Sequence, residues 1–108
     1  MKVTAERGGG IAGPRYHERI GPIETEFARN GAAIVALLKS VGFFELPERY
    51  PQKHRISDAL WGTLEVEDGA RTHKVAYQTG SEIPGELSEI LKLLSEEFRW
   101  DDVARAPA

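Results

Sequence analysis

Two stretches of alternating apolar and polar residues on either side of Asp68-Gly69 constrain the fold more than any other feature of the chain. Alternation with a period of two is typical of strands that bury one face, and Asp-Gly between two such strands predicts a hairpin turn. If Asp68 and Gly69 form the turn, every apolar side chain falls on one face. The predicted cross-strand pairs are Leu64 with His73, Gly62 with Val75, and Leu60 with Tyr77.

The N-terminal residues predict a second hairpin of similar construction. Met1, Val3 and Ala5 alternate with polar residues, and the alternation returns over residues 15–20. Glycine-rich residues 8–14 separate the two stretches and predict a long, flexible hairpin tip. Phosphate-binding glycine loops lead into a helix, whereas these glycines join two strands, so we do not expect a phosphate site here.

Each hairpin is followed by residues with helical periodicity. Residues 23–41 carry apolar side chains at helical spacings, and Gly42 is a natural helix end. Asn30-Gly31 interrupts this pattern, so Asn30 is an alternative helix start as an N-cap. The second helix is predicted to begin at Pro84. The two apolar stripes are Ile23, Phe27, Ile34, Leu38 and Val41, and then Ile83, Leu87, Ile90, Leu91, Leu94 and Phe98.

The order ββαββα predicts a two-layer α+β fold, with a four-stranded, mainly antiparallel sheet and both helices on one face. A chain of 108 residues has the size of one domain, which we assign to residues 1–100, and residues 101–108 are expected to fray. In this topology the glycine-rich tip and residues 43–57 emerge at one end of the sheet, and the Asp68-Gly69 turn lies at the other. Residues 8–14 and 51–58 are therefore the candidate parts of a binding surface.

The composition narrows the classes of function. The chain has 14 Lys and Arg residues against 17 Asp and Glu residues, and this net charge of -3 argues against a nucleic-acid partner. It has no cysteine, so thiolate metal sites and cysteine nucleophiles are excluded. Its longest apolar run, residues 32–38, is far shorter than the ~20 residues of a membrane span, and the N-terminus does not resemble a signal peptide. We therefore expect a cytoplasmic protein that does not bind membranes.

Candidate catalytic residues are few. The three histidines, His17, His54 and His73, are too scattered to predict a metal site, and His73 falls on the predicted core face. The residue types of a hydrolase triad occur together at His54, Ser57 and Asp58, but such triads are assembled from distant chain positions. A polar loop is the simpler interpretation. The sequence thus predicts a protein that is not an enzyme and holds no cofactor of its own.

Four segments of the sequence carry a more specific signal. They are ERGGGIAG near the N-terminus, VGFFELP after the first predicted helix, SDALWGTLEVEDGARTHKVAY through the second hairpin, and IPGELSEILKLL at the second helix. In these segments the chain resembles the emfourin-like family, which comprises small bacterial protein inhibitors of protealysin and other thermolysin-family metalloproteases. The resemblance covers residues 1–100. The chain departs from the family pattern at Gly62, where an aromatic residue is expected.

The resemblance implies that two loops block the protease, one by binding an aspartate to the enzyme's catalytic zinc and one by placing apolar side chains in the substrate pockets. Asp58 is the implied zinc ligand, and only in the complex, while a role as an ordinary cap or turn residue, or another loop acid as the ligand, remains open. Asp68 is better explained as a turn residue. The implied protease-binding residues are Gly9, Gly10, Ile11, Ala12, Gly13, Asp58 and Leu60. The free protein is expected to be a monomer, and the alternative function is a small adaptor that binds a partner without affecting catalysis.

Overall fold

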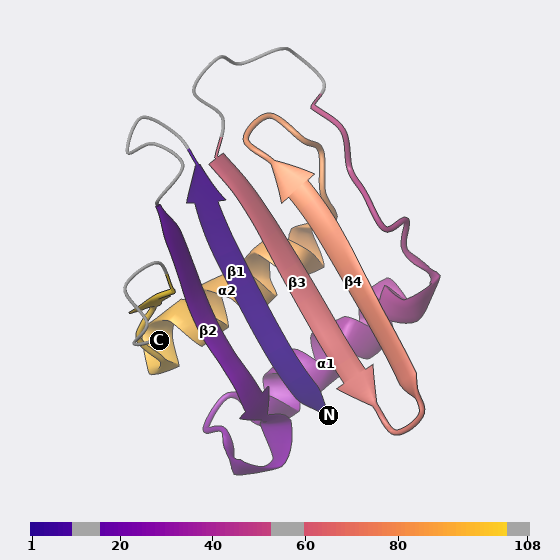
Figure 1. The fold of residues 1–108 in the computed structure, drawn as a ribbon. Helices are drawn as coiled ribbons and strands as arrows, with labels where there is room; N and C mark the ends of the chain where they lie inside the picture. Colours follow the sequence, from indigo (N-terminus) through magenta and orange to yellow (C-terminus); the bar gives the residue numbers. More distant parts are fainter. Residues whose placement is uncertain (10–15, 53–59, 104–108) are drawn as a thin grey trace.

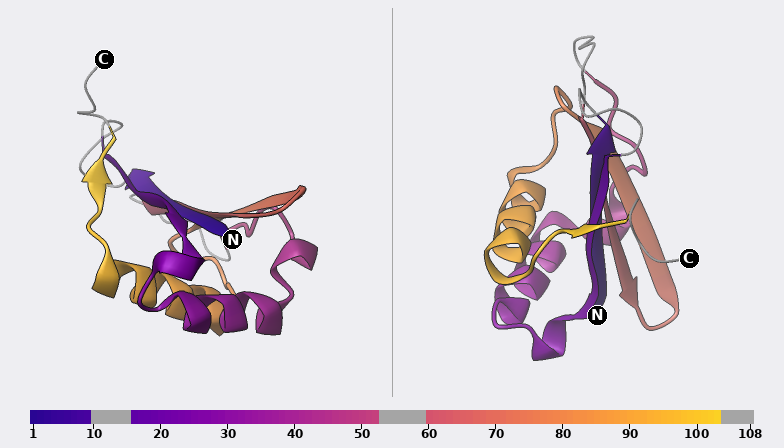
Figure 2. Two further views of the ribbon diagram at one scale, coloured as in Figure 1. Left: turned by 90° about the horizontal axis from the view of Figure 1, so that it is seen from below. Right: turned by 60° about the vertical axis from the view of Figure 1, so that its left-hand side comes forward.

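One antiparallel sheet with two helices on one face makes up the computed structural model, which describes residues 1–9, 16–52 and 60–103 (Figure 1). The elements are β1 (Lys2–Gly9), β2 (His17–Glu24), α1 (Gly31–Val41), β3 (Leu60–Asp68), β4 (Arg71–Gln78), α2 (Gly85–Glu97) and β5 (Asp101–Asp102). The order across the sheet is β4-β3-β1-β2-β5. Figure 2 shows both helices on the same side of the sheet. The predicted two-layer α+β class is therefore confirmed.

The sheet has five strands in place of the predicted four. The additional strand, β5, pairs with β2 through Asp101 with Arg19 and Asp102 with Glu18. The expectation that the chain frays from residue 101 therefore does not hold for these two aspartates. A two-residue strand has no detectable alternation, so the sequence pattern could not reveal it. Residues 104–108 lie outside the described part of the chain.

The segment before α1 differs from the predicted helix. Ile23 belongs to β2 and pairs with Val3. It is followed by a short 3-10 helix, η1 (Thr25–Phe27), in which the Phe27 side chain is 86% exposed. The prediction of a helix from residue 23 is therefore wrong, and the alternative start with Asn30 at the N-cap position is the one observed. The helical spacing of Ile23 and Phe27 was therefore coincidental, because one residue lies in a strand and the other in the 3-10 helix that follows it.

The ends of α1 are stabilised by different groups. The Asn30 side chain makes no capping hydrogen bond. Instead the Glu97 carboxylate, at the end of α2, accepts hydrogen bonds from the backbone N–H groups of Arg29 (2.6 Å) and Asn30 (2.8 Å). At the other end Gly42 has a φ of 64° and ends the helix, as predicted. The first helix is thus capped by a residue far away in the sequence.

The second hairpin contains the predicted strands in a register shifted by two residues. The observed pairs are Asp68 with Arg71, Val66 with His73, Leu64 with Val75 and Gly62 with Tyr77. Gly69 and Ala70 form the turn, and Gly69 has a φ of 62°. In the described ranges no residue with a side chain has a positive φ, and this turn uses the positive φ of Gly69 alone. Because the shift is an even number of residues, the predicted faces of the strands are retained.

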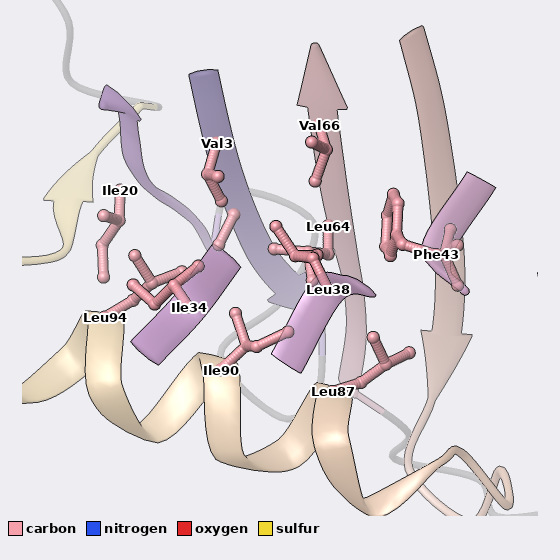
Figure 3. Packing of buried hydrophobic residues seen from close by; sticks show 12 residues of the cluster. Val3, Ile20, Ile34, Leu38, Phe43, Leu64, Val66, Leu87, Ile90 and Leu94 are labelled. Atoms are coloured by element: carbon pink, nitrogen blue, oxygen red, sulfur yellow. The ribbon is translucent and has the colours of Figure 1, made fainter. Parts of the chain in front are cut away.

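The core lies between the sheet and the two helices, as Figure 3 shows. Alternate residues of the strands point toward the helices, and the α2 residues Leu87, Ile90 and Leu94 point toward the sheet. The fully buried set is Val3, Ala5, Ile20, Ile34, Leu38, Phe43, Leu64, Val66, Val75, Leu87, Ile90 and Leu94. No helix in the described ranges is long and apolar enough to span a membrane.

The path from α1 to β3 differs from the expected one. The short 3-10 helix η2 (Phe43–Glu45) lies close to Asp68, so residues 43–45 are at the turn end of the sheet. From there the chain follows the edge of β4, where Arg49 forms a bridge with Ala76 (Figure 1). The expectation that residues 43–57 all emerge beside the glycine-rich tip is therefore wrong for the first residues of this segment. An 11-residue helix is about 16 Å long and cannot span a nine-residue strand of about 30 Å.

Candidate functional site

The residues implied in protease binding fall partly within the described structure. Gly9 and Leu60 are described, and they lie at the end of β1 and the start of β3. The expectation that the start of the third strand lies beside the glycine-rich segment is confirmed by this arrangement. Outside the described residues lie Gly10, Ile11, Ala12, Gly13 and Asp58, together with His54 and Ser57.

Gly9 and Leu60 are cross-strand partners. Gly9 has a φ of 81°, a conformation that glycine adopts readily, and its N–H donates to the carbonyl oxygen of Tyr16 (3.2 Å). The backbone of Leu60 is held on its other side by Thr79. The Leu60 N–H donates to the Thr79 hydroxyl (3.0 Å), and the Leu60 carbonyl oxygen accepts from the Thr79 N–H (2.8 Å). The Leu60 side chain is nevertheless 47% exposed, so an ordered backbone presents a free apolar side chain.

On the face of the sheet away from the helices, Trp61 covers Gly8, its cross-strand partner. A Cβ atom at Gly8 would lie 2.7 Å from the Trp61 ring and 2.4 Å from the carbonyl oxygen of Tyr16. The His17 ring meets the Trp61 ring edge-on, with 5.1 Å between the ring centroids. These contacts tie the ends of β1, β2 and β3 together at the position where the undescribed segments begin.

A cluster of charged side chains lies beside Trp61 on the same face. Glu6 accepts a hydrogen bond from Arg19 Nε (2.7 Å), and its second carboxylate oxygen lies 3.2 Å from His17 Nε2. Burial raises the pKa of Glu6, but the hydrogen bonds from Arg19 and His17 outweigh this effect and hold the pKa below its usual value. The carboxylate is therefore ionised at neutral pH and links β1 to β2.

A second charged cluster lies on the helix-facing side of the same strands. Glu18 accepts hydrogen bonds from the Tyr16 hydroxyl (2.8 Å) and from Arg7 Nε (2.8 Å). The hydrogen bond from Tyr16 is the largest cause of a lowered pKa at Glu18, and the bond from Arg7 lowers it further. The hydrogen bond between Tyr16 and Glu18 also raises the pKa of Tyr16. The Arg7 guanidinium also lies 4.0 Å from the centre of the Trp100 ring. Arg7 thus connects the sheet to the residues that follow α2.

Gly62 and Tyr77 form a matching glycine and aromatic pair on the helix-facing side. A Cβ atom at Gly62 would lie 2.5 Å from the Tyr77 ring, so the ring packs directly against the glycine backbone. Burial raises the pKa of Tyr77 to about 12, against an opposing electrostatic effect of Arg7. The aromatic ring beside Gly62 thus comes from the neighbouring strand.

His73 has a structural role, as its place on the predicted core face suggested. Its Nε2 atom lies 2.7 Å from the carbonyl oxygen of Leu46, and its ring packs edge-on against Phe43. Across residues 1–9, 16–52 and 60–103, no three His, Cys, Asp or Glu side chains gather closely enough to hold a metal ion.

Comparison of the chain with protein-family models, curated proteins and solved structures gave no match.

The sequence did not reveal two cross-strand pairs of a glycine with an aromatic residue. These pairs are Gly8 with Trp61 and Gly62 with Tyr77. A signal for them exists, because glycine opposite a large aromatic residue is a recurrent cross-strand combination. Using this signal requires the correct register, and the predicted register placed Leu60 opposite Tyr77. The order of strands in the sheet, which puts β1 beside β3, was also needed to find the first pair.

Proposed function

We propose that this protein inhibits thermolysin-type zinc metalloproteases by presenting residues 9–13 and 58–60 to the active site. The observation that supports this most is the pairing of Gly9 with Leu60. Ile11 and Asp58 are each two residues from this pair in the sequence. A two-residue tether spans at most about 7 Å. The proposal therefore requires that the Ile11 side chain and the Asp58 carboxylate meet one partner within this reach of the described pair.

The proposed chemistry replaces the water on the catalytic zinc of the target enzyme. Zinc in such enzymes has three protein ligands and one open position, where water becomes the nucleophile. The Asp58 carboxylate takes this position at the ~2.0–2.2 Å typical of a zinc–oxygen bond. Peptide hydrolysis stops because the nucleophile is gone. A side-chain ligand also offers the zinc no peptide bond to cleave, while the apolar Ile11 side chain fills a substrate pocket.

The described base of the two segments supports tight binding. The contact between Trp61 and Gly8 and the bonds of Glu6 to Arg19 and His17 fix three strand ends relative to one another. A preordered base reduces the entropy that is lost when the protein binds a partner. The exposed Leu60 side chain adds an apolar contact at the same edge.

The decisive experiment compares two aspartate variants in the titration of a thermolysin-type protease. We expect Asp58→Asn to raise the inhibition constant by several orders of magnitude, because it removes the negative charge that binds zinc. Asp68→Asn is the matched control, since Asp68 lies in the turn hairpin at the opposite end and bonds to Arg71 (3.2 Å). Equal inhibition by Asp58→Asn and the parent protein would refute the zinc-ligand role.

Ile11→Ala tests the apolar contact separately. Truncation of a side chain that a partner buries should weaken inhibition by roughly 1–3 kcal/mol. We expect the melting temperature to stay unchanged, since the tip of a hairpin contributes little to a hydrophobic core. A large fall in melting temperature would assign Ile11 to the core instead of the interface.

The same protease assay separates the alternative classes. A binding adaptor would associate with a partner while leaving peptide hydrolysis at its full rate. A hydrolase would turn over a small substrate and lose that activity in His54→Ala or Ser57→Ala. An inhibitor titrates the protease with a stoichiometric end point. Full protease activity at saturating concentrations of this protein would therefore favour the adaptor.

A further inference from the structure

A cavity of about 510 Å³ lies between α2 and the helix-facing side of the sheet, at the Leu60 end. Its volume is in the ~300–1,000 Å³ range typical of small-molecule sites. The walls include two aromatic rings, Tyr77 and Trp100, and two aliphatic side chains, Leu60 and Leu91. Residues of α2 line one side of the cavity and residues of the strands line the other. Figure 1 shows α2 passing behind β1 and β3.

Gly62 keeps this space open. The Tyr77 ring lies directly against the Gly62 backbone, where a Cβ atom would come within 2.5 Å of it. A larger residue at this position would push the ring away from the sheet and into the cavity. The Tyr77 hydroxyl is protonated at neutral pH, as in any tyrosine, and burial raises its pKa further to about 12, so it can donate a hydrogen bond. The cavity thus combines flat apolar walls with a neutral polar group.

The charge of the cavity contrasts with the charge of the chain. Arg7 and Lys92 both line it, and no Asp or Glu is among its lining residues in the described ranges. The whole chain carries a net charge of -3. Arg7 is held in place by Glu18 (2.8 Å) and by the Trp100 ring, whereas Lys92 is exposed. Glu18 offsets part of the Arg7 charge, so the exposed ammonium of Lys92 and the remaining N–H donors of Arg7 are the groups complementary to an anion with an apolar body.

We propose that this cavity binds a small organic anion with a flat apolar body, in the manner of an aromatic carboxylate. The aromatic walls contact the body of the ligand, and Arg7 and Lys92 attract its oxyanion. This binding does not depend on protease inhibition, and it is measured with the free protein. Failure of one proposal therefore leaves the other standing.

A pair of fluorescent probes that differ in charge tests the ligand class. Anilinonaphthalene sulfonate is an aromatic anion, and phenylnaphthylamine has the same aromatic body without the sulfonate. We expect one saturable site for the anionic probe, with an affinity roughly tenfold higher than that of the neutral probe. High salt should reduce this preference by screening. The Trp100 ring lines the cavity, so its emission should change as the probe binds.

Three variants place the site. Lys92→Glu should weaken the anionic probe roughly tenfold and leave the neutral probe unchanged. Lys74→Glu makes the same charge change on β4, away from this cavity, and should alter neither affinity. Ser88→Phe introduces a ring from an exposed position of α2 that lines the cavity, and should abolish the binding of both probes at an unchanged melting temperature.

Several results would overturn the proposal. Equal affinities of the two probes would remove the role of the cations, and so would equal effects of Lys92→Glu and Lys74→Glu. Undiminished binding to Ser88→Phe, once its thermal unfolding matches the parent protein, would place the probe elsewhere on the surface. No saturable binding of either probe would exclude the site altogether.

Discussion

Gly8→Ala tests whether the base of the proposed binding edge is as tightly packed as the contacts indicate. The new Cβ atom would lie 2.4 Å from the Tyr16 carbonyl oxygen and 2.7 Å from the Trp61 ring. An ordinary contact begins at 3.4 Å, so the carbonyl must move by about 1 Å and the ring by about 0.7 Å. The carbonyl also accepts the hydrogen bond from the Gly9 N–H, which this movement would break (3.2 Å).

These displacements set the magnitude of the expected loss. Overpacking costs typically 1–3 kcal/mol and a lost hydrogen bond about 1 kcal/mol, so we expect the free energy of unfolding to fall by about 2–4 kcal/mol. For a domain of this size the melting temperature should fall by roughly 10–30 °C. Urea unfolding followed by tryptophan emission measures the change directly, because Trp61 is one of the two tryptophans.

Gly85→Ala is the matched control for this prediction. Gly85 begins α2, and a Cβ atom there would meet no other atom within 4 Å. The same chemical change should therefore leave stability unchanged or raise it by up to about 1 kcal/mol, since alanine favours helix. If Gly8→Ala unfolds at the same urea concentration as Gly85→Ala, the close packing of Trp61 on Gly8 is refuted.

Three further predictions concern other contacts. Glu97→Ala should lower the free energy of unfolding by about 1 kcal/mol, because it removes the cap of α1. Glu96→Ala is the control, since Glu96 lies in the exposed last turn of α2, and it should leave the free energy of unfolding unchanged. Urea unfolding of the two variants measures the difference. Because the folded-state pKa of Glu6 lies below its unfolded value, its contribution to stability is complete above about pH 5 and is lost as the pH falls through the folded-state pKa. The stability difference between the parent protein and Glu6→Gln should therefore shrink between pH 7 and pH 3, and a constant difference would contradict the network with Arg19. Leu60→Ala should raise the inhibition constant roughly fivefold, which corresponds to about 1 kcal/mol, because about half of this side chain is exposed and available to a partner.

Local pattern predicted most of the fold correctly. The alternation in the second hairpin, the stripe of α2 and the stop at Gly42 all correspond to elements of the structure. The errors lie where local patterns are ambiguous. Ile23 and Phe27 fit a helical spacing yet lie in a strand and a 3-10 turn, because two apolar residues cannot distinguish these periods. The predicted register of the second hairpin was wrong by two residues. A shift by an even number of residues keeps every side chain on the same face, so the alternation of apolar and polar residues cannot distinguish the two registers.

The candidate site was predictable only in part. Sequence reasoning placed Leu60 and the glycine-rich segment at one end, and the pairing of Gly9 with Leu60 agrees with it. The covering of Gly8 by Trp61 was not predictable, because these residues are far apart in the sequence and meet only through the pairing of β1 with β3. The same holds for Arg7 over Trp100.

The sequence by itself determined the class of the fold, the faces of its strands and the end of the sheet at which the candidate segments begin. These properties follow from hydrophobic periodicity and turn chemistry, which act over a few neighbouring residues. Only the tertiary structure decided the central position of β1, the addition of β5, the cap of α1 by Glu97 and the cavity beside α2. Each of these depends on contacts between residues distant in the sequence, and such contacts form only when the whole chain packs.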